Sequence, residues 1–309
     1  MLTSEVASAR IAVVGSVFLD LLYDRPFTGP GAEPEPIRSF HGGIARNIAE
    51  NLGWHGLRPR LITLLTPNAM GDEVAAELLH AGVDVFAKHA NPGIGVYRAF
   101  VRSGEIEEYR IEQPLIEQLD WPFVRTHLRS ATHVVIETGL DPAMTRDLLR
   151  ECKTWSVPVY GVPTRLHDIP IDDHLTTIST MNCVLMNRVE AETLLRRQLP
   201  DGDAAARAVG DLQRLGVGEV VITLGAAGVV AAARDQAAAM FPAPAIDVVS
   251  TLGCGDAFTA GFVAASSSRQ PFASAIEVAL ELARRTAATP GPVCGSAELS
   301  SESGVARGV

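Results

Sequence analysis

The sequence has little positive charge, few cysteines and no long apolar run. Its 309 residues include 26 Lys plus Arg against 36 Asp plus Glu, which gives a formal net charge of −10. A nucleic-acid-binding protein needs a cationic surface, so the charge argues against that class of partner. No run of about 20 apolar residues could span a bilayer, and the first nine residues lack the pattern of a signal peptide. We expect a cytoplasmic protein that binds neither nucleic acid nor membrane.

The cysteines are too few and too scattered for a structural metal or disulfide framework. The four are Cys152, Cys183, Cys254 and Cys294, with no C-x-x-C pair and no grouping with the eight histidines. Neither a zinc site nor a disulfide-linked fold is expected. Apolar residues make up 47% and charged residues 20% of the chain. This balance predicts a globular protein with a substantial core.

Short apolar runs alternate with segments of helical period along most of the chain. The runs are 11–15, 60–65, 132–137, 158–162, 183–186 and 219–224. Apolar runs of this length that are rich in β-branched residues are typical of buried parallel strands. Helical spacing is clearest over 43–52, 72–79 and 204–215. The alternation predicts an α/β fold with a mainly parallel central sheet and helices on both faces.

Two segments near the amino terminus depart from this alternation. Residues 95–111 alternate apolar and polar positions around Ser103-Gly104, which predicts a β-hairpin. Residues 23–40 contain four prolines, which exclude a long helix and favour irregular or edge-strand structure. We expect both to form a small β piece.

The predicted organisation is one domain with two lid segments and a short tail. The domain spans 1–295, and the lid segments lie at about 22–41 and 94–112. The tail, 296–309, is rich in Ser and Gly and is predicted to be disordered.

The stretch from Ser250 to Phe258 reads S-T-L-G-C-G-D-A-F and leads into a helical segment. Small residues at a helix start let the backbone approach an anion, and the free amides and dipole there attract phosphate. Asp256 could accept the proton of a hydroxyl that attacks phosphate. The G-x-G-D residues alone favour the other interpretation, in which Asp256 is an ordinary first-turn residue and the glycines form a turn. The residues favour Cys254 as a small side chain that fills space between the glycines; the alternative is a thiol whose pKa is lowered by its place at a helix start.

A second candidate site lies in the first fifth of the chain. Gly42 and Gly43 precede a helix, and Asn47, one turn into it, offers both donor and acceptor groups, which suits a polyol. Asp20 follows the first predicted strand, where loops of α/β sheets hold ligands, and could accept two sugar hydroxyls. A helix start with an exposed Asn and a solvated loop carboxylate explain the same residues without a ligand.

Three further features lie at the ends of later predicted strands. Asn187 and Glu190 have the spacing of a capping box, which the residues alone favour over a Mg²⁺ held through water by Glu190. Thr223, Gly225 and Gly228 lie in a T-L-G-A-A-G turn that is either a structural hairpin or a ligand site. Glu137 closes an apolar strand, with the same two interpretations.

In their order and spacing these segments resemble the ribokinase-like (pfkB) carbohydrate kinase family from about residue 10 to about residue 295. The shared motifs are G-S-x-x-x-D ending at Asp20, the paired glycines with Asn47, N-x-x-E at 187–190, T-L-G-x-x-G at 223–228 and G-x-G-D at 253–256. The resemblance implies a ribokinase-like fold with a small β lid and ATP-dependent phosphorylation of an alcohol.

The resemblance also implies a role for each candidate residue. Asp256 would be the catalytic base, with the amides of Gly253, Cys254 and Gly255 stabilising the transferring phosphate. The substrate would be held by Asp20, Gly42, Gly43, Asn47 and Glu137. ATP would lie against Asn187, Thr223, Gly225 and Gly228. Glu190 would organise Mg²⁺.

Within the family, residues 42–52 and 187–194 resemble pseudouridine kinases more closely than ribokinases. Ile44, Ala45 and Arg46 stand where ribokinases usually have lysine, glycine and alanine. This implies transfer to the 5′-OH of pseudouridine. Another nucleoside, a free sugar such as ribose or fructose, and a non-catalytic sensor stay open as alternatives.

Two expectations of the resemblance stay open. Ser250 stands where many members have aspartate, in a region that contributes to a monovalent-cation site in some relatives, so a K⁺ requirement is undecided. Relatives often pair through their lids, so a homodimer formed in that way is conceivable.

Overall fold

The computed structural model describes residues 10–24, 26, 36–102 and 105–295. The amino-terminal segment before Arg10, most of the proline-rich segment, the predicted turn at Ser103-Gly104 and the predicted tail 296–309 lie outside the described residues.

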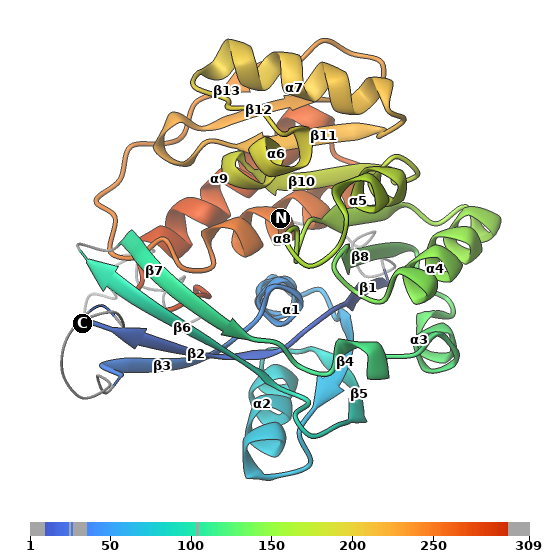
Figure 1. Cartoon of the computed structure of the whole chain (residues 1–309), viewed down its shortest axis with the longest axis vertical. Helices are drawn as coiled ribbons and strands as arrows, with labels where there is room; N and C mark the ends of the chain where they lie inside the picture. The colour runs from blue at the N-terminus through green and yellow to red at the C-terminus, as the bar shows by residue number, and fades with distance from the viewer. Residues whose placement is uncertain (1–9, 25, 27–35, 103–104, 296–309) are drawn as a thin grey trace, which may run out of the picture.

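A large sheet forms the centre of the molecule (Figure 1). In the described residues it has nine strands in the order β13-β12-β11-β10-β9-β8-β1-β4-β5. All neighbouring strands from β11 to β5 are parallel, and β12 and β13 add an antiparallel edge. The strands are β1 Ile11–Val14, β4 Arg60–Leu65, β5 Asp84–His89, β8 His133–Glu137, β9 Val159–Val162, β10 Cys183–Asn187, β11 Glu219–Thr223, β12 Val229–Ala232 and β13 Ala239–Phe241.

Helices cover both faces of this sheet, because successive side chains of a strand point to opposite faces. In β1, Ile11 and Val13 join one apolar cluster and Ala12 and Val14 join the other. On one face lie α1 Ile44–Trp54, α2 Ala69–His80, α8 Cys254–Ser267 and α9 Phe272–Ala287. On the other lie α3 Trp121–Leu128, α4 Pro142–Trp155, α5 Ile171–Ile178, α6 Arg188–Leu195 and α7 Gly202–Arg214. The predicted α/β architecture is confirmed.

The chain also forms a smaller sheet, which lies to one side of the large one (Figure 1). Its strands are β2 Phe18–Tyr23, β3 Arg38–Gly42, β6 Gly95–Arg102 and β7 Glu105–Glu112, in the order β3-β2-β6-β7. β6 and β7 are the predicted hairpin. No helix in the described part of the chain is both long and apolar enough to cross a membrane.

One placement predicted from the sequence is wrong. Asp20 was expected in a loop after the first strand, but it lies in the middle of β2, between Phe40 of β3 and Tyr97 of β6. The connection after β1 is only three residues long, so the chain enters the smaller sheet at once. Asp20 therefore sits on a rigid strand.

Several candidate residues lie together where the parallel strands of the large sheet end, at the edge formed by their carboxyl ends. Glu137 ends β8, Asn187 ends β10, and Thr223 ends β11 directly beside Asn187. In parallel sheets this edge is where ligands bind. The chain enters the smaller sheet from the same edge, through the residues that follow β1.

Candidate active site

The first turn of α8 combines one tightly packed glycine with one that faces open space. Gly253 precedes the helix with φ of 74°, and a Cβ there would lie 2.0 Å from the carbonyl oxygen of Pro292. A Cβ on Gly255 would meet no atom of the described residues within 4 Å. The first amides of a helix have no partner inside the helix. The start of α8 therefore offers backbone donors and an open approach, as an anion requires.

Asp256 lies in this first turn and contacts the amino-terminal half of the chain. Nδ2 of Asn47, in α1, donates a 2.8 Å hydrogen bond to Oδ2 of Asp256. Burial raises the pKa of Asp256 to about 8; the hydrogen bond from Asn47 lowers it, and the charges of Glu137, Asp20 and Glu190 raise it further. A carboxyl group with such a pKa is suited to proton transfer near neutral pH.

Asp20 and the paired glycines form the adjoining wall. Asp20 is only 4% exposed, and its carboxylate packs against Gly42, where a Cβ would lie 2.0 Å from Oδ2 of Asp20. Gly43 has φ of 102°, and a Cβ there would lie 2.7 Å from the carbonyl oxygen of Ser16. Burial raises the pKa of Asp20 to about 7, and the charge of Arg46 lowers it. Gly42 thus makes room for the Asp20 carboxylate, and Gly43 permits the turn into α1.

Glu137 holds the loop after β1 against the start of α1. Its Oε1 accepts hydrogen bonds from the amides of Ser16 at 2.9 Å and Ala45 at 3.1 Å. Its Oε2 accepts one from the Ser16 hydroxyl at 2.9 Å. Burial raises the pKa of Glu137, and these hydrogen bonds oppose the rise. The contacts give Glu137 a part in shaping the site, and direct contact with a substrate stays a prediction.

Asn187 and Glu190 form the capping box that their spacing predicts. Oδ1 of Asn187 accepts from the Glu190 amide at 2.9 Å, and Oε2 of Glu190 accepts from the Asn187 amide at 2.7 Å. Burial raises the pKa of Glu190 to about 7. The box uses one oxygen of the carboxylate, so Oε1 is not needed for the cap.

The turn after β11 again combines a packed glycine with an open one. Gly228 has φ of 102°, and a Cβ there would lie 2.1 Å from the carbonyl oxygen of Phe241. Gly225 has φ of 60° and open space around its Cβ position within the described residues. Thr223 lies directly before this turn, beside Asn187. The packing of β13 explains Gly228, whereas Gly225 leaves room for a ligand.

The alternative of a lowered thiol pKa at Cys254 is wrong. Burial raises the pKa of its thiol to about 11, and the neighbouring charge of Asp256 adds to the rise. Loss of solvation therefore outweighs the helix-terminal effect that favours a thiolate. A reactive thiol at this position is therefore not supported.

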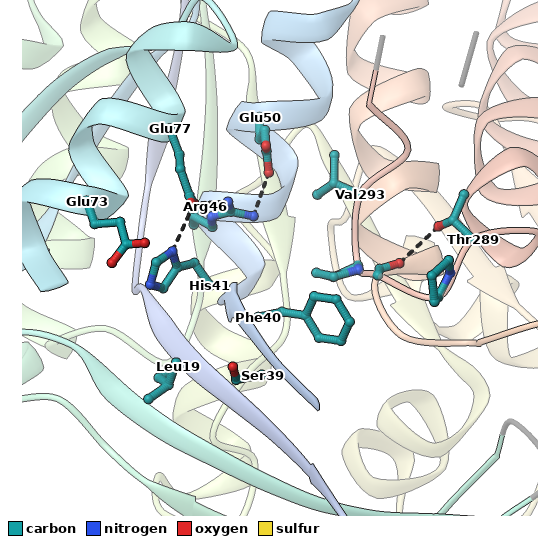
Figure 2. Close-up of a pocket in the computed structure, with 13 residues that line it drawn as sticks. Leu19, Ser39, Phe40, His41, Arg46, Glu50, Glu73, Glu77, Thr289 and Val293 are labelled. Atoms are coloured by element: carbon teal, nitrogen blue, oxygen red, sulfur yellow. Dashed lines mark hydrogen bonds and ion pairs between the residues drawn. The ribbon is translucent and has the colours of Figure 1, made fainter. Parts of the chain in front are cut away.

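A cavity of about 610 Å³ lies between β3, α1, α2 and residues 289–293, and Figure 2 shows its walls. Its polar lining includes His41, Arg46, Glu50, Glu73 and Glu77. No pattern in the sequence indicates that these residues meet, because they come from three separate elements. None of the predicted site residues lines the cavity, but Arg46 is the chain neighbour of Asn47.

Comparison with known proteins identifies the family. Residues 8–296 match the model of the pfkB family of carbohydrate kinases. The chain belongs to this family. Its members are ATP-dependent phosphotransferases, and the expected class of enzyme is confirmed at this level. The chain is thus a nucleoside or sugar kinase of the pfkB family.

Individual relatives are similar over almost the whole chain. A guanosine-inosine kinase of Exiguobacterium acetylicum is 25% identical over 289 residues, covering 91% of this chain and 95% of that protein. A pseudouridine kinase of Escherichia coli strain K12 is 23% identical over 281 residues, covering 89% and 86%.

Solved structures share the fold. A structure of Arabidopsis thaliana ribokinase complexed with ribose and ATP has a TM-score of 0.79 at 19% identity and covers 94% of this chain and 97% of its own. An adenosine kinase from Sinorhizobium meliloti has a TM-score of 0.79 at 18% identity, covering 93% and 96%. The ribokinase-like fold is confirmed.

Proposed function

We propose that this kinase transfers the γ-phosphoryl group of ATP to the 5′-hydroxyl of a ribonucleoside, with Asp256 as the base. The observation that carries the proposal is the Asn47–Asp256 hydrogen bond at the start of α8. It joins the proposed acceptor wall to a helix start that carries a carboxyl group with a pKa of about 8 and has open space at Gly255. Acceptor alcohol and phosphate would meet there.

The acceptor side of the site would be built by Asp20, the glycines at 42 and 43, and Asn47. An asparagine amide has two N–H donors, and one of those of Asn47 is used by Asp256. The other remains for a ribose hydroxyl, and the Asp20 carboxylate, held on β2, would accept ribose O–H groups. Glu137 would act indirectly, by fixing Ser16 and Ala45 at the floor of this wall.

The chemical step would need little covalent chemistry from the protein. Asp256 takes the proton of the 5′-hydroxyl while the oxygen of that hydroxyl forms a bond to the γ-phosphorus of ATP. The bond between the γ-phosphorus and the oxygen that bridges it to the β-phosphate breaks, and ADP leaves. The amides of Gly253 and Gly255 would stabilise the charge on the transferring group, whereas the amide of Cys254 already donates to the carbonyl oxygen of Thr251 at 3.3 Å. A positioned base contributes about 3–5 kcal/mol to such a step, whereas orientation supplies about 7–11 kcal/mol. Alignment is therefore the main task of this site.

The residues around the strand ends fit a nucleotide. Open space at Gly225 and Gly255 leaves room for phosphate and nucleoside against the backbone, and Asn187 and Thr223 lie side by side at the ends of β10 and β11. Mg²⁺, when bound, would neutralise charge on the triphosphate. Glu190 would hold it through water with the oxygen that the capping box leaves free, because Mg²⁺ retains several waters in protein sites. The K⁺ requirement stays undecided at Ser250.

We propose pseudouridine as the nucleoside, on the resemblance of residues 42–52 and 187–194 to pseudouridine kinases. A purine nucleoside is the second candidate, because the guanosine-inosine kinase is similar over more of the chain.

The smaller sheet would act as a lid that excludes water from the site. Its exposed Tyr109 and Ile111, on β7, are where a homodimer through the lid would form.

An acceptor panel tests the proposal directly. Pseudouridine, uridine, guanosine, inosine, adenosine, ribose and fructose 6-phosphate are each incubated with ATP and Mg²⁺, and ADP formation and product mass are measured. We expect phosphorylation of a nucleoside, with the highest kcat/KM for pseudouridine. Phosphorylation of a free sugar alone would refute the nucleoside assignment. Nucleoside binding without ADP formation would replace the enzyme with a sensor.

A further inference from the structure

Arg46 is a buried cation next to the proposed active site. Its side chain is 5% exposed, and it projects from α1 toward the cavity of Figure 2. Nη1 donates a 3.3 Å hydrogen bond to Oδ1 of Asn47 and lies 2.5 Å from Oε2 of Glu50. Nη2 donates to Oε2 of Glu77 at 3.2 Å. One guanidinium therefore joins three side chains.

The contact with Asn47 determines what the other end of that amide can do. Because Arg46 donates to Oδ1, the carboxamide is oriented with its NH₂ group toward Asp256. If the amide flipped, its oxygen would face the Asp256 carboxylate and its NH₂ would face the guanidinium, so both contacts would be repulsive. A chain of contacts thus runs from Arg46 through Asn47 to Asp256.

We propose that Arg46 is a positioning residue for the proposed base: it fixes the Asn47 amide, and through it the direction in which Asp256 faces the acceptor alcohol. The inference rests on the proposed function. The Asn47 contact occupies Oδ2 of Asp256 and so leaves Oδ1 as the oxygen that takes the proton. Arg46 touches neither substrate nor phosphate in this scheme and acts only through Asn47.

Arg46 is itself anchored from two sides. Glu50 lies one turn along α1, and Glu77 comes from α2. Glu77 also pairs through Oε2 with Nδ1 of His41 at 2.9 Å, and His41 lies in β3, next to Gly42. The base is thereby connected to a strand of the proposed lid. Movement of β3 would reach Asp256 through His41, Glu77, Arg46 and Asn47.

The composition of this cluster argues against a merely structural part for Arg46. A buried ion-pair network is commonly no more stable than apolar side chains of the same size. Arg46 also keeps one buried atom, Nε, with no hydrogen-bond partner in the described residues, which adds a penalty for burying a polar group. A wholly apolar cluster would therefore serve folding as well, so folding alone does not account for this network. Arg46→Met by itself leaves Glu50 and Asp20 without their cation and should lower stability, which is why the test below reads the Asp256 titration as well as kcat.

Charged groups face the chain of contacts from several elements, and each bears on its pH dependence. Asp256 is under the influence of Glu137 of β8, Asp20 of β2 and Glu190 of α6. Arg46 is faced by Glu50 of α1, Glu73 and Glu77 of α2, and His41 of β3, and its charge lowers the pKa of Asp20. Loss of the hydrogen bond from the Asn47 side chain removes the interaction that lowers the pKa of Asp256. The carboxyl of Asp256 should then titrate at a higher pH.

The test is a double-mutant cycle with Arg46→Met, Asn47→Ala and the double variant, together with Arg46→Lys. Steady-state kinetics use the acceptor that the panel identifies, and carbon NMR follows the titration of the Asp256 carboxyl without substrates. We expect Arg46→Met to lower kcat by about 10- to 100-fold through misalignment, with little change in the KM for ATP. The Asp256 titration should move to higher pH. Arg46→Lys should recover part of kcat, because the cation remains but the fork is lost.

The Asn47→Ala background separates positioning from general damage. There, Arg46→Met should cause no further loss of kcat and no further rise of the Asp256 pKa; the remaining effect, through the higher pKa of Asp20, has the opposite sign. If the two losses multiply, or if the Asp256 titration is the same in folded Arg46→Met as in the wild type, the proposal is overturned. If Arg46→Met does not fold, the same comparison is made with Arg46→Lys.

Arg125→Met is the matched control. It removes an arginine that makes two hydrogen bonds to Glu151 on the surface, far from the site in the chain and in the fold. We expect it to leave kcat and the titration unchanged. If the wild type phosphorylates no acceptor, the proposed function fails, and the titration in the four variants still tests Arg46 independently.

Discussion

Asn47 and Asp256 are 209 positions apart in the chain and share a 2.8 Å hydrogen bond. The contact is possible because α1 and α8 pack side by side on the same face of the large sheet. The proposed acceptor site, on β2, β3 and α1, and the proposed phosphate site, at the start of α8, thus meet through two side chains. Their alignment depends on this packing more than on either segment alone.

Replacing Asp256 by Asn should abolish most turnover while keeping the fold. The new side chain still has an oxygen to accept the Asn47 hydrogen bond, but it cannot take a proton. We expect kcat to fall by about 10²–10⁴-fold, with ATP binding, measured by calorimetry, unchanged. Asp147→Asn, in an exposed ion pair with Arg150, is the control. A kcat near that of the wild type would remove Asp256 from the role of base.

The same substitution should stabilise the protein at alkaline pH. The pKa of Asp256 is about 8 in the folded protein, against an ordinary value of 3.8 for an exposed aspartate, so between these values the folded state binds more protons than the unfolded state. Stability therefore falls as the pH rises through this window. A neutral Asn avoids that loss, and we expect Tm at pH 8 to rise by about 2–4 °C. Calorimetric scans at pH 5 and pH 8 check this, because the gain should be smaller at pH 5.

The pH profile of kcat/KM should have an acid limb near pH 8. The profile reports the free enzyme, in which burial raises the pKa of Asp20 to about 7 and that of Asp256 to about 8. The base must be deprotonated, so kcat/KM should increase with pH through this range. Because the two carboxyls interact, the apparent pKa values seen in the profile describe the Asp20–Asp256 pair and not either carboxyl alone.

Asp20→Asn tests that pairing. The charge of Asp20 raises the pKa of Asp256, so its removal should move the acid limb to lower pH while KM for the acceptor increases. An acid limb near pH 4 in the wild type would show that neither carboxyl governs turnover. An unchanged acceptor KM in Asp20→Asn would remove Asp20 from the substrate site.

The sequence predicted most of the fold because the large sheet has a simple pattern. Its central strands are buried on both faces and read as continuous apolar runs, such as the one that became β8. β5 was missed because its partly buried residues mix polar with apolar types, and β13 was missed because it has only three residues, two of them exposed. β2 was missed because it follows β1 after three residues, where a loop is the usual expectation for an α/β sheet.

The site was less predictable than the fold. Motif spacing pointed to Asp256 and Asn47, and the structure brings these two together. The contacts of Arg46 with Glu77, and of Glu77 with His41, join α1, α2 and β3, and no local pattern encodes such a meeting. The error at Cys254 has the same origin, because the extent of burial that raises its pKa depends on the whole fold.

Gly42→Ala should weaken acceptor binding in the same way as a substitution of Asp20 itself. A Cβ at position 42 would lie 2.0 Å from Oδ2 of Asp20, so the carboxylate must move away from its present place. We expect KM for the acceptor to rise by about tenfold, the size of effect expected for a lost hydrogen bond to a charged group. The double variant with Asp20→Ala should be no worse than Asp20→Ala alone.

Gly210→Ala is the control for Gly42→Ala. It lies in α7, and a Cβ there would meet no atom of the described residues within 4 Å. Because alanine is a better helix former, this variant should be up to about 1 kcal/mol more stable with wild-type kinetics. If Gly42→Ala behaves in the same way, the close packing of Asp20 on Gly42 has no part in substrate binding.

Glu190→Gln separates the two interpretations of Glu190. A glutamine oxygen can still accept from the Asn187 amide and preserve the capping box, but it carries no charge for Mg²⁺. We expect Tm to stay within about 2 °C of the wild type, and the Mg²⁺ concentration for half-maximal activity to rise by about tenfold. Glu190→Ala should share the Mg²⁺ effect and also lose about 1 kcal/mol of stability with the cap. If both variants keep the Mg²⁺ dependence of the wild type, Glu190 serves only as the cap of α6, and the metal must be held elsewhere on the strand-end edge.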